Sequence, residues 1–74
     1  MPHVIVKMWP GRSEAQKEQL AAQIAKDMME IIQCPEDSIS IAVEEIAEEE
    51  WKEKVHPEIF GKDTHLYKKP GYSE

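Results

Sequence analysis

The second residue, Pro2, carries the most distinctive chemistry in this sequence of 74 residues. If Met1 is removed, Pro2 becomes the amino terminus and bears a free secondary amine. An ordinary α-amino group titrates at roughly pH 8. Apolar burial or a neighbouring cation lowers that value, because both disfavour the charged form. An amine that titrates near neutral pH can remove a proton from the carbon beside a carbonyl. Pro2 is therefore our candidate catalytic base.

Three further residues could serve a site built around Pro2. Arg12 precedes a predicted helix, where a guanidinium can hold a carboxylate through two parallel hydrogen bonds, although an exposed loop arginine is the simpler interpretation. Trp51 follows the second predicted strand and could form either a pocket wall or an anchor for the tail. Ser40 lies on that strand, on the side away from the helix, where a surface serine is the plain interpretation.

Two strands and one helix must position these residues. Residues 3–9 are rich in β-branched and aromatic types and end at a Pro-Gly pair, which predicts a strand. Residues 38–46 alternate apolar and polar types, which predicts a second strand. A helix of about twenty residues separates them. We therefore expect a β-α-β unit with parallel strands and a right-handed connection.

The predicted helix has clear signals at both ends. Ser13 and Gln16 have the spacing of a capping box. Cys34-Pro35 ends the helix, because the residue before a proline avoids the helical region. Between them, apolar residues recur at helical period and predict one buried stripe, formed by Leu20, Ala21, Ile24, Ala25, Met28, Ile31 and Ile32.

The last third of the chain is polar and broken. Three glutamates within residues 47–51 are typical of a helix start. His56-Pro57 and Gly61 leave room for only short helical turns near residues 58–60. Lys69-Pro70-Gly71 predicts a type II turn. We expect an α+β fold: one domain over residues 1–74, with a β-α-β unit and short C-terminal helical turns.

Composition excludes several classes of protein. A net charge of −6 argues against nucleic acid as a partner. Cys34 is the only cysteine, so no internal disulfide can form, and His3, His56 and His65 lack a ligand spacing. We therefore expect neither metal nor cofactor. The apolar runs are too short for a membrane span and no secretory segment is present, so we expect a cytoplasmic protein.

Strand geometry separates the candidate residues within one chain. A strand of seven residues at about 3.3 Å each places Pro2 and Arg12 more than about 20 Å apart. Trp51 follows the parallel strand and so lies at the Arg12 end. So short a chain also needs support from self-association. We therefore expect an antiparallel homodimer with a continuous sheet, in which Pro2 of one subunit meets Arg12 and Trp51 of the other.

These features resemble the 4-oxalocrotonate tautomerase family over residues 2 to about 51. The resemblance rests on Met1-Pro2, the first strand, the turn at residues 11–13, the helix start rich in Glu, Gln and Lys, and the Ser-Ile-Ser-Ile strand. The closing stretch at 68–72 resembles a bacterial branch of that family that forms dimers rather than hexamers.

The resemblance implies a mechanism and a set of roles. Pro2 matches the family's catalytic proline, which moves a proton between the enol and keto forms of a 2-keto acid. Arg12 matches a substrate-binding arginine, and Trp51 falls where the family has an aromatic residue, usually Phe. Ser40 stands where the best-known members have a second arginine. That replacement favours a monocarboxylate such as an arylpyruvate enol, in a dimer or a higher oligomer.

Two other functions remain open from the sequence. A protonated Pro2 could serve as the acid in hydration or dehalogenation of an unsaturated acid. The chain could instead be a dimeric protein-interaction module without activity, with Trp9 and the acidic residues between 44 and 50 as its binding face.

Overall fold

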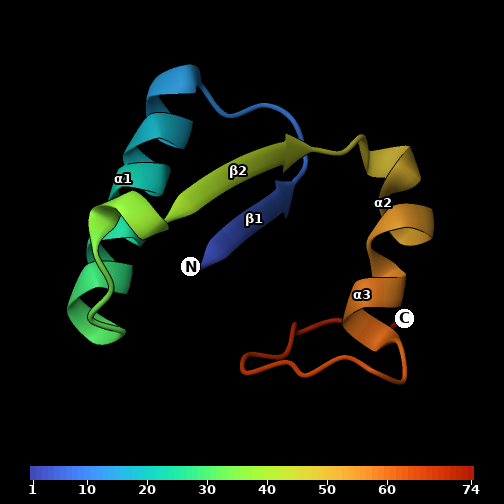
Figure 1. The fold of residues 1–74 in the computed structure, drawn as a ribbon. Helices are drawn as coiled ribbons and strands as arrows, with labels where there is room; N and C mark the ends of the chain where they lie inside the picture. The colour runs from blue at the N-terminus through green and yellow to red at the C-terminus, as the bar shows by residue number, and fades with distance from the viewer.

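Two short parallel strands form the centre of the computed structural model, which describes residues 1–74 (Figure 1). Strand β1 spans His3–Met8 and strand β2 spans Ser40–Glu45. His3 pairs with Ser40 at one end of the ladder, and Met8 pairs with Glu45 at the other. The predicted parallel pairing is confirmed, although both strands are shorter than the predicted ranges 3–9 and 38–46.

Helix α1 spans Glu14–Ile31 and connects the two strands. The predicted capping box is present, because the Gln16 N–H donates to Ser13 Oγ at 3.1 Å and the Ser13 N–H donates to Gln16 Oε1 at 2.9 Å. After the helix, Gln33 adopts a φ of 60° and turns the chain. A short 3-10 helix, Glu36–Ser38, then leads into β2.

Helix α1 covers one face of the sheet (Figure 1). Met8 from that face lines a small hollow together with Leu20 of α1, and Lys17 of α1 pairs with Glu45 of β2 at 3.4 Å. Because side chains alternate along a strand, the opposite face carries Ile5, which is 47% exposed, and no helix lies on it.

The predicted buried stripe of α1 is wrong for the single chain, because no residue of α1 is buried and Leu20 is 37% exposed. The exposure is greatest at the carboxyl end of the stripe. Ile31 and Ile32 are 78% and 59% exposed. The reason is length, because eighteen helical residues span about 27 Å. Six strand residues span only about 20 Å. The last turn of α1 therefore extends past the sheet.

Helices α2 (Glu48–Lys54) and α3 (His56–Phe60) follow β2 and lead away from the carboxyl ends of the strands (Figure 1). Three glutamates occupy the first turn of α2, where the helix dipole favours negative charge. The short α3 was expected from the sequence. The tail at residues 62–74 folds back beside α3, without the predicted type II turn, because Gly71 does not adopt the positive φ that this turn requires.

Very little of the chain is buried. Val55, between α2 and α3, is the only residue that counts as buried, at 5% exposure. The accessible surface is 6103 Å². A monomer of 8.6 kDa is expected to expose about 4,700 Å². The radius of gyration is 14.0 Å, against about 11 Å for a compact domain of this length. No helix is both long and apolar enough to cross a membrane.

Candidate functional site

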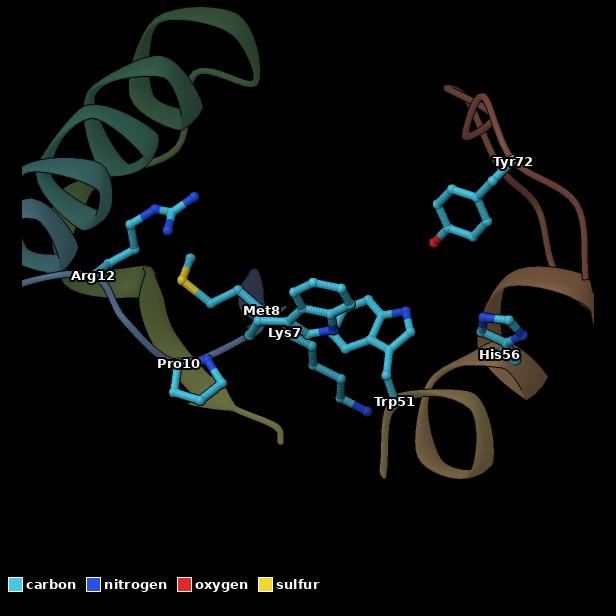
Figure 2. Close-up of a pocket in the computed structure, with 8 residues that line it drawn as sticks. Lys7, Met8, Pro10, Arg12, Trp51, His56 and Tyr72 are labelled. Atoms are coloured by element: carbon cyan, nitrogen blue, oxygen red, sulfur yellow. The ribbon is translucent and has the colours of Figure 1, made fainter. Parts of the chain in front are cut away.

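A pocket of about 660 Å³ lies at the carboxyl end of β1 (Figure 2). Residues 7–10 form its floor, and Arg12 stands on the side of α1. Trp51, His56 and Tyr72 come from the C-terminal half of the chain. The volume falls within the range of sites for small molecules, roughly 300–1,000 Å³. The pocket therefore lies between the β-α-β unit on one side and α2, α3 and the C-terminal tail on the other.

Arg12 supplies a free cation to this pocket. It is the only arginine in the chain and forms no hydrogen bond or ion pair within it. The connection before it depends on Gly11, whose φ of 126° lies in a region that residues with a Cβ rarely adopt. A free guanidinium beside a pocket is suited to hold a carboxylate with two parallel hydrogen bonds.

Aromatic rings form the middle of the pocket and the side opposite Arg12. Both tryptophans of the chain line it, with Trp9 and Trp51 edge to face at a centroid distance of 6.4 Å. His56 stacks on Tyr72, with centroids 6.1 Å apart and ring planes 25° apart. The pocket is therefore cationic at one end and aromatic at the other (Figure 2).

Lys7 also borders the pocket, but its charge already has a partner. Its amine forms an ion pair with Glu58 of α3. The hydrogen bond to Glu58 raises the pKa of Lys7 above its usual value, and the negative charges of Glu58 and Glu44 act in the same direction. Lys7 thus ties the end of β1 to α3 and remains protonated.

Pro2 and Ser40 lie together at the opposite end of the sheet. The Ser40 N–H donates to the Pro2 carbonyl oxygen at 3.2 Å. The Ser40 hydroxyl lies 2.6 Å from His3 Nδ1. Pro2 is half-buried, whereas Met1 is fully exposed. Within one chain, the structure thus groups Pro2 with Ser40 and groups Arg12 with Trp51, and it does not bring the two pairs together.

The predicted site contains only two of the eight pocket residues, and Lys7, His56 and Tyr72 are among those that it lacks. In the sequence, Lys7 is interpreted as an ordinary polar position of the strand. His56 is interpreted as part of a helix break before Pro57, and Tyr72 is interpreted as part of an irregular tail. Their places in the pocket depend on how α3 and the tail fold back, and no local pattern reports that path. The short spacing of His56 and Phe60, one helical turn, is the only local signal for an aromatic cluster, and it is weak.

The described chain has no group of three or more histidine, cysteine, aspartate or glutamate side chains placed to hold a metal ion. His3 contacts Ser40, and His56 lies among aromatic rings. Cys34 is a free thiol within 3.7 Å of the Met28 carbonyl oxygen.

The arrangement of strands and helix has a counterpart among solved structures. The chain is similar to YwhB, described as a homologue of 4-oxalocrotonate tautomerase, with a TM-score of 0.61 and 33% sequence identity. The similarity covers 62% of this chain and 75% of that one. The fold is therefore that of the small β-α-β isomerases related to 4-oxalocrotonate tautomerase.

Sequence comparison gives the family. Residues 2–62 match the family model described as tautomerase enzyme. A probable tautomerase of Xylella fastidiosa is 37% identical over 75 residues, which cover all of this chain and 92% of that protein. Tautomerase PptA of an Enterobacter species is 40% identical over 99% of both chains. The chain belongs to the tautomerase family, and the tautomerase names of these relatives support an isomerase.

Proposed function

We propose that this protein is a cofactor-independent tautomerase of the cytoplasm that converts the enol and keto forms of a 2-keto acid, with Pro2 as the base. The substrate is a monocarboxylate of the arylpyruvate type, and residues 1–74 form one domain of a homodimer. The observation that supports this best is the place of Pro2 directly after Met1 and immediately before β1, in a chain of the tautomerase family.

The proposed reaction moves one proton and needs no other reagent. The neutral amine of Pro2 removes a proton from C3 of the keto acid, and the C–H electron pair becomes the C2=C3 double bond. The carbonyl oxygen takes up the negative charge and then receives the proton from the Pro2 ammonium. The reverse sequence converts the enol to the ketone. Removal of Met1 is required, because an amide nitrogen at Pro2 is not basic.

Arg12 is the group that we assign to the substrate carboxylate. Its guanidinium has no partner in the chain, whereas Lys7 is already paired with Glu58. Ser40 lies beside Pro2, where the family resemblance implies a second arginine, and its neutral hydroxyl contacts His3 Nδ1. One free cation and one hydroxyl therefore favour a substrate with a single carboxylate.

The exposed surface supports a dimer. The chain exposes about 1,400 Å² more than a compact monomer of its mass. An interface that covered this excess on each subunit would reach the size of obligate dimers, which bury roughly 2,000–5,000 Å² in total. The uncovered face of the sheet with Ile5 and the exposed Ile31 and Ile32 are apolar surfaces for such an interface.

The dimer also completes the site. Pro2 and Arg12 lie at opposite ends of the sheet, so an antiparallel pairing of two sheets would place Pro2 of one subunit at the pocket of the other. Trp9 and Trp51 would then lie beside the amine. Such rings exclude water and disfavour the charged form of the amine.

A Pro2→Ala variant tests this function. We expect the rate of phenylenolpyruvate ketonisation, followed by absorbance, to fall at least about 100-fold, because general acid–base catalysis contributes roughly 10²–10⁴-fold. Circular dichroism should show an unchanged fold. Intact mass must show that Met1 is absent from the wild-type protein. Equal rates for the two proteins, or Met1 retained in protein from its native cell, would contradict the proposal.

A further inference from the structure

The pocket has a wall that the proposed chemistry does not use. His56 and Tyr72 stand opposite Arg12, with Met8, Lys7 and Trp51 between them (Figure 2). Neither residue is near Pro2 in the chain, and the substrate carboxylate is assigned to Arg12 rather than to either of them. We call this pair the tail wall, because Tyr72 reaches it from the C-terminal tail.

The tail wall is held together by aromatic contacts. His56 stacks on Tyr72, and Phe60 lies edge-on to both rings at centroid distances of 5.1 and 6.0 Å. His56 Nδ1 is buried and has no hydrogen-bond partner in the chain. The imidazole is therefore placed by its ring contacts rather than by a hydrogen bond at that nitrogen. Tyr72 remains 50% exposed, which leaves part of its surface for a ligand in the pocket.

The path of the tail brings Tyr72 to this position. A Cβ on Gly61 would lie 2.3 Å from the Pro57 carbonyl oxygen, so only glycine permits the turn that ends α3. Thr64 Oγ1 then donates to the Gly61 carbonyl oxygen at 2.9 Å and to the Ile59 carbonyl oxygen at 3.2 Å. These contacts start the return of the chain toward the pocket.

We propose that the tail wall determines substrate specificity by packing against the group that the 2-keto acid carries on C3. This inference rests on the proposed function. Arg12 and Tyr72 lie on opposite sides of the pocket, so a substrate whose carboxylate is held at Arg12 would extend toward Tyr72 (Figure 2). A flat ring can lie against Tyr72 in offset or edge geometry and gain more than its buried area alone provides. A short alkyl group has no ring face with which to make this contact. Tyr72 is thus a specificity-determining residue, and His56 is a positioning residue that acts through it.

The test compares one reaction on two substrates. Phenylpyruvate and 2-oxobutanoate both exchange hydrogen at C3 in D₂O, and proton NMR follows the exchange of either one. The protein is the full chain with Met1 removed. In the Tyr72→Ala variant we expect kcat/KM for phenylpyruvate to fall about tenfold, mainly through KM, because an aromatic contact is lost. We expect less than about a twofold change for 2-oxobutanoate.

Matched variants separate the wall from general damage. Tyr67 is a fully exposed tail tyrosine that does not line the pocket, so Tyr67→Ala should leave the preference for phenylpyruvate unchanged. His56→Ala should reduce that preference as Tyr72→Ala does, and His56→Phe should restore it, because a flat ring can still support Tyr72. Tyr72→Phe should likewise keep the preference that Tyr72→Ala loses.

Two results would overturn the proposal: an equal loss on both substrates, or an unchanged preference in Tyr72→Ala. Failure of the proposed function looks different, because wild type and Pro2→Ala would then exchange both substrates equally slowly. In that case, quenching of Trp9 and Trp51 fluorescence measures phenylpyruvate binding directly. About tenfold weaker binding in Tyr72→Ala would support the tail wall, and equal binding would overturn it.

Discussion

Two impaired variants, Pro2→Ala and Arg12→Ala, should recover activity when their subunits are mixed. Each variant lacks one half of the proposed composite site. In a mixed dimer, the Arg12→Ala subunit provides an intact Pro2 and the Pro2→Ala subunit provides an intact Arg12. One of the two sites is then complete, while the other lacks both groups. The structure motivates this experiment because six strand residues separate the two groups by about 20 Å within a chain.

The size of the recovery follows from symmetry. Random association of equal amounts makes half of the dimers mixed, and each mixed dimer has one complete site of two. The mixture should therefore reach about a quarter of the wild-type activity. The activity of each unmixed variant sets the background of the assay. For Pro2→Ala this activity should be at least about 100-fold below wild type. Each charged hydrogen bond that Arg12→Ala removes contributes about 1.5–3 kcal/mol, so the activity of this variant should fall at least about tenfold.

The assay is phenylenolpyruvate ketonisation after joint unfolding and refolding of the two variants. Each variant alone passes through the same treatment as a control, and wild type shows how much activity the treatment preserves. Native mass spectrometry of differently labelled subunits confirms that mixed dimers form. If mixed dimers are present and the activity stays at the average of the two parents, both groups act within one chain and the composite site is wrong.

Gly11→Ala should destabilise the protein by about 1–3 kcal/mol and raise KM, because the φ of 126° at this position strains any residue with a Cβ. Gly71→Ala is the matched control, because Gly71 has no positive φ and a Cβ added there meets no atom within 4 Å. Its free energy of unfolding, measured with urea, should change little. Val55→Ala removes two methyl groups from the single buried residue and should cost about 1–2 kcal/mol in the same measurement. The pKa of Lys7 is raised, first by its hydrogen bond to Glu58. The Lys7–Glu58 pair therefore stabilises the fold at neutral pH, and this stabilisation is lost only as the pH rises through the raised pKa. The stability difference between wild type and Lys7→Met should therefore be constant from pH 7 to about 9 and smaller at about pH 11, and a difference that grows with pH would contradict this sign.

The central β-α-β unit could be predicted from local signals. The capping box at Ser13 and the alternation along the two strands report local geometry, and the structure contains both. Ser40 was correctly placed on the face away from α1, because side-chain alternation fixes the face once the strand is known. Arg12 and Trp51 were correctly expected at the same end, and the structure places both in one pocket.

The rest depends on packing that no local pattern encodes. Ile31 and Ile32 continue the apolar period of α1, yet their exposure is set by where the sheet ends. His56 and Tyr72 meet across sixteen positions of sequence, through a turn at Gly61 and a tail without regular structure. The roles of Pro2 and Ser40 toward a substrate depend on a second subunit, which the pattern of one chain does not describe.

The positions of Pro2 and Tyr72 near the two ends of the sequence restrict where a purification tag can be placed. A tag fused ahead of Pro2 would turn its nitrogen into an amide, so it must be cleaved to leave proline as the first residue. Only two residues would separate Tyr72 from a tag appended after Glu74, so the tag would crowd the stacked rings of Tyr72 and His56. Activity should therefore be recorded on untagged material, or a tag at either end will resemble a defect in catalysis or in substrate choice.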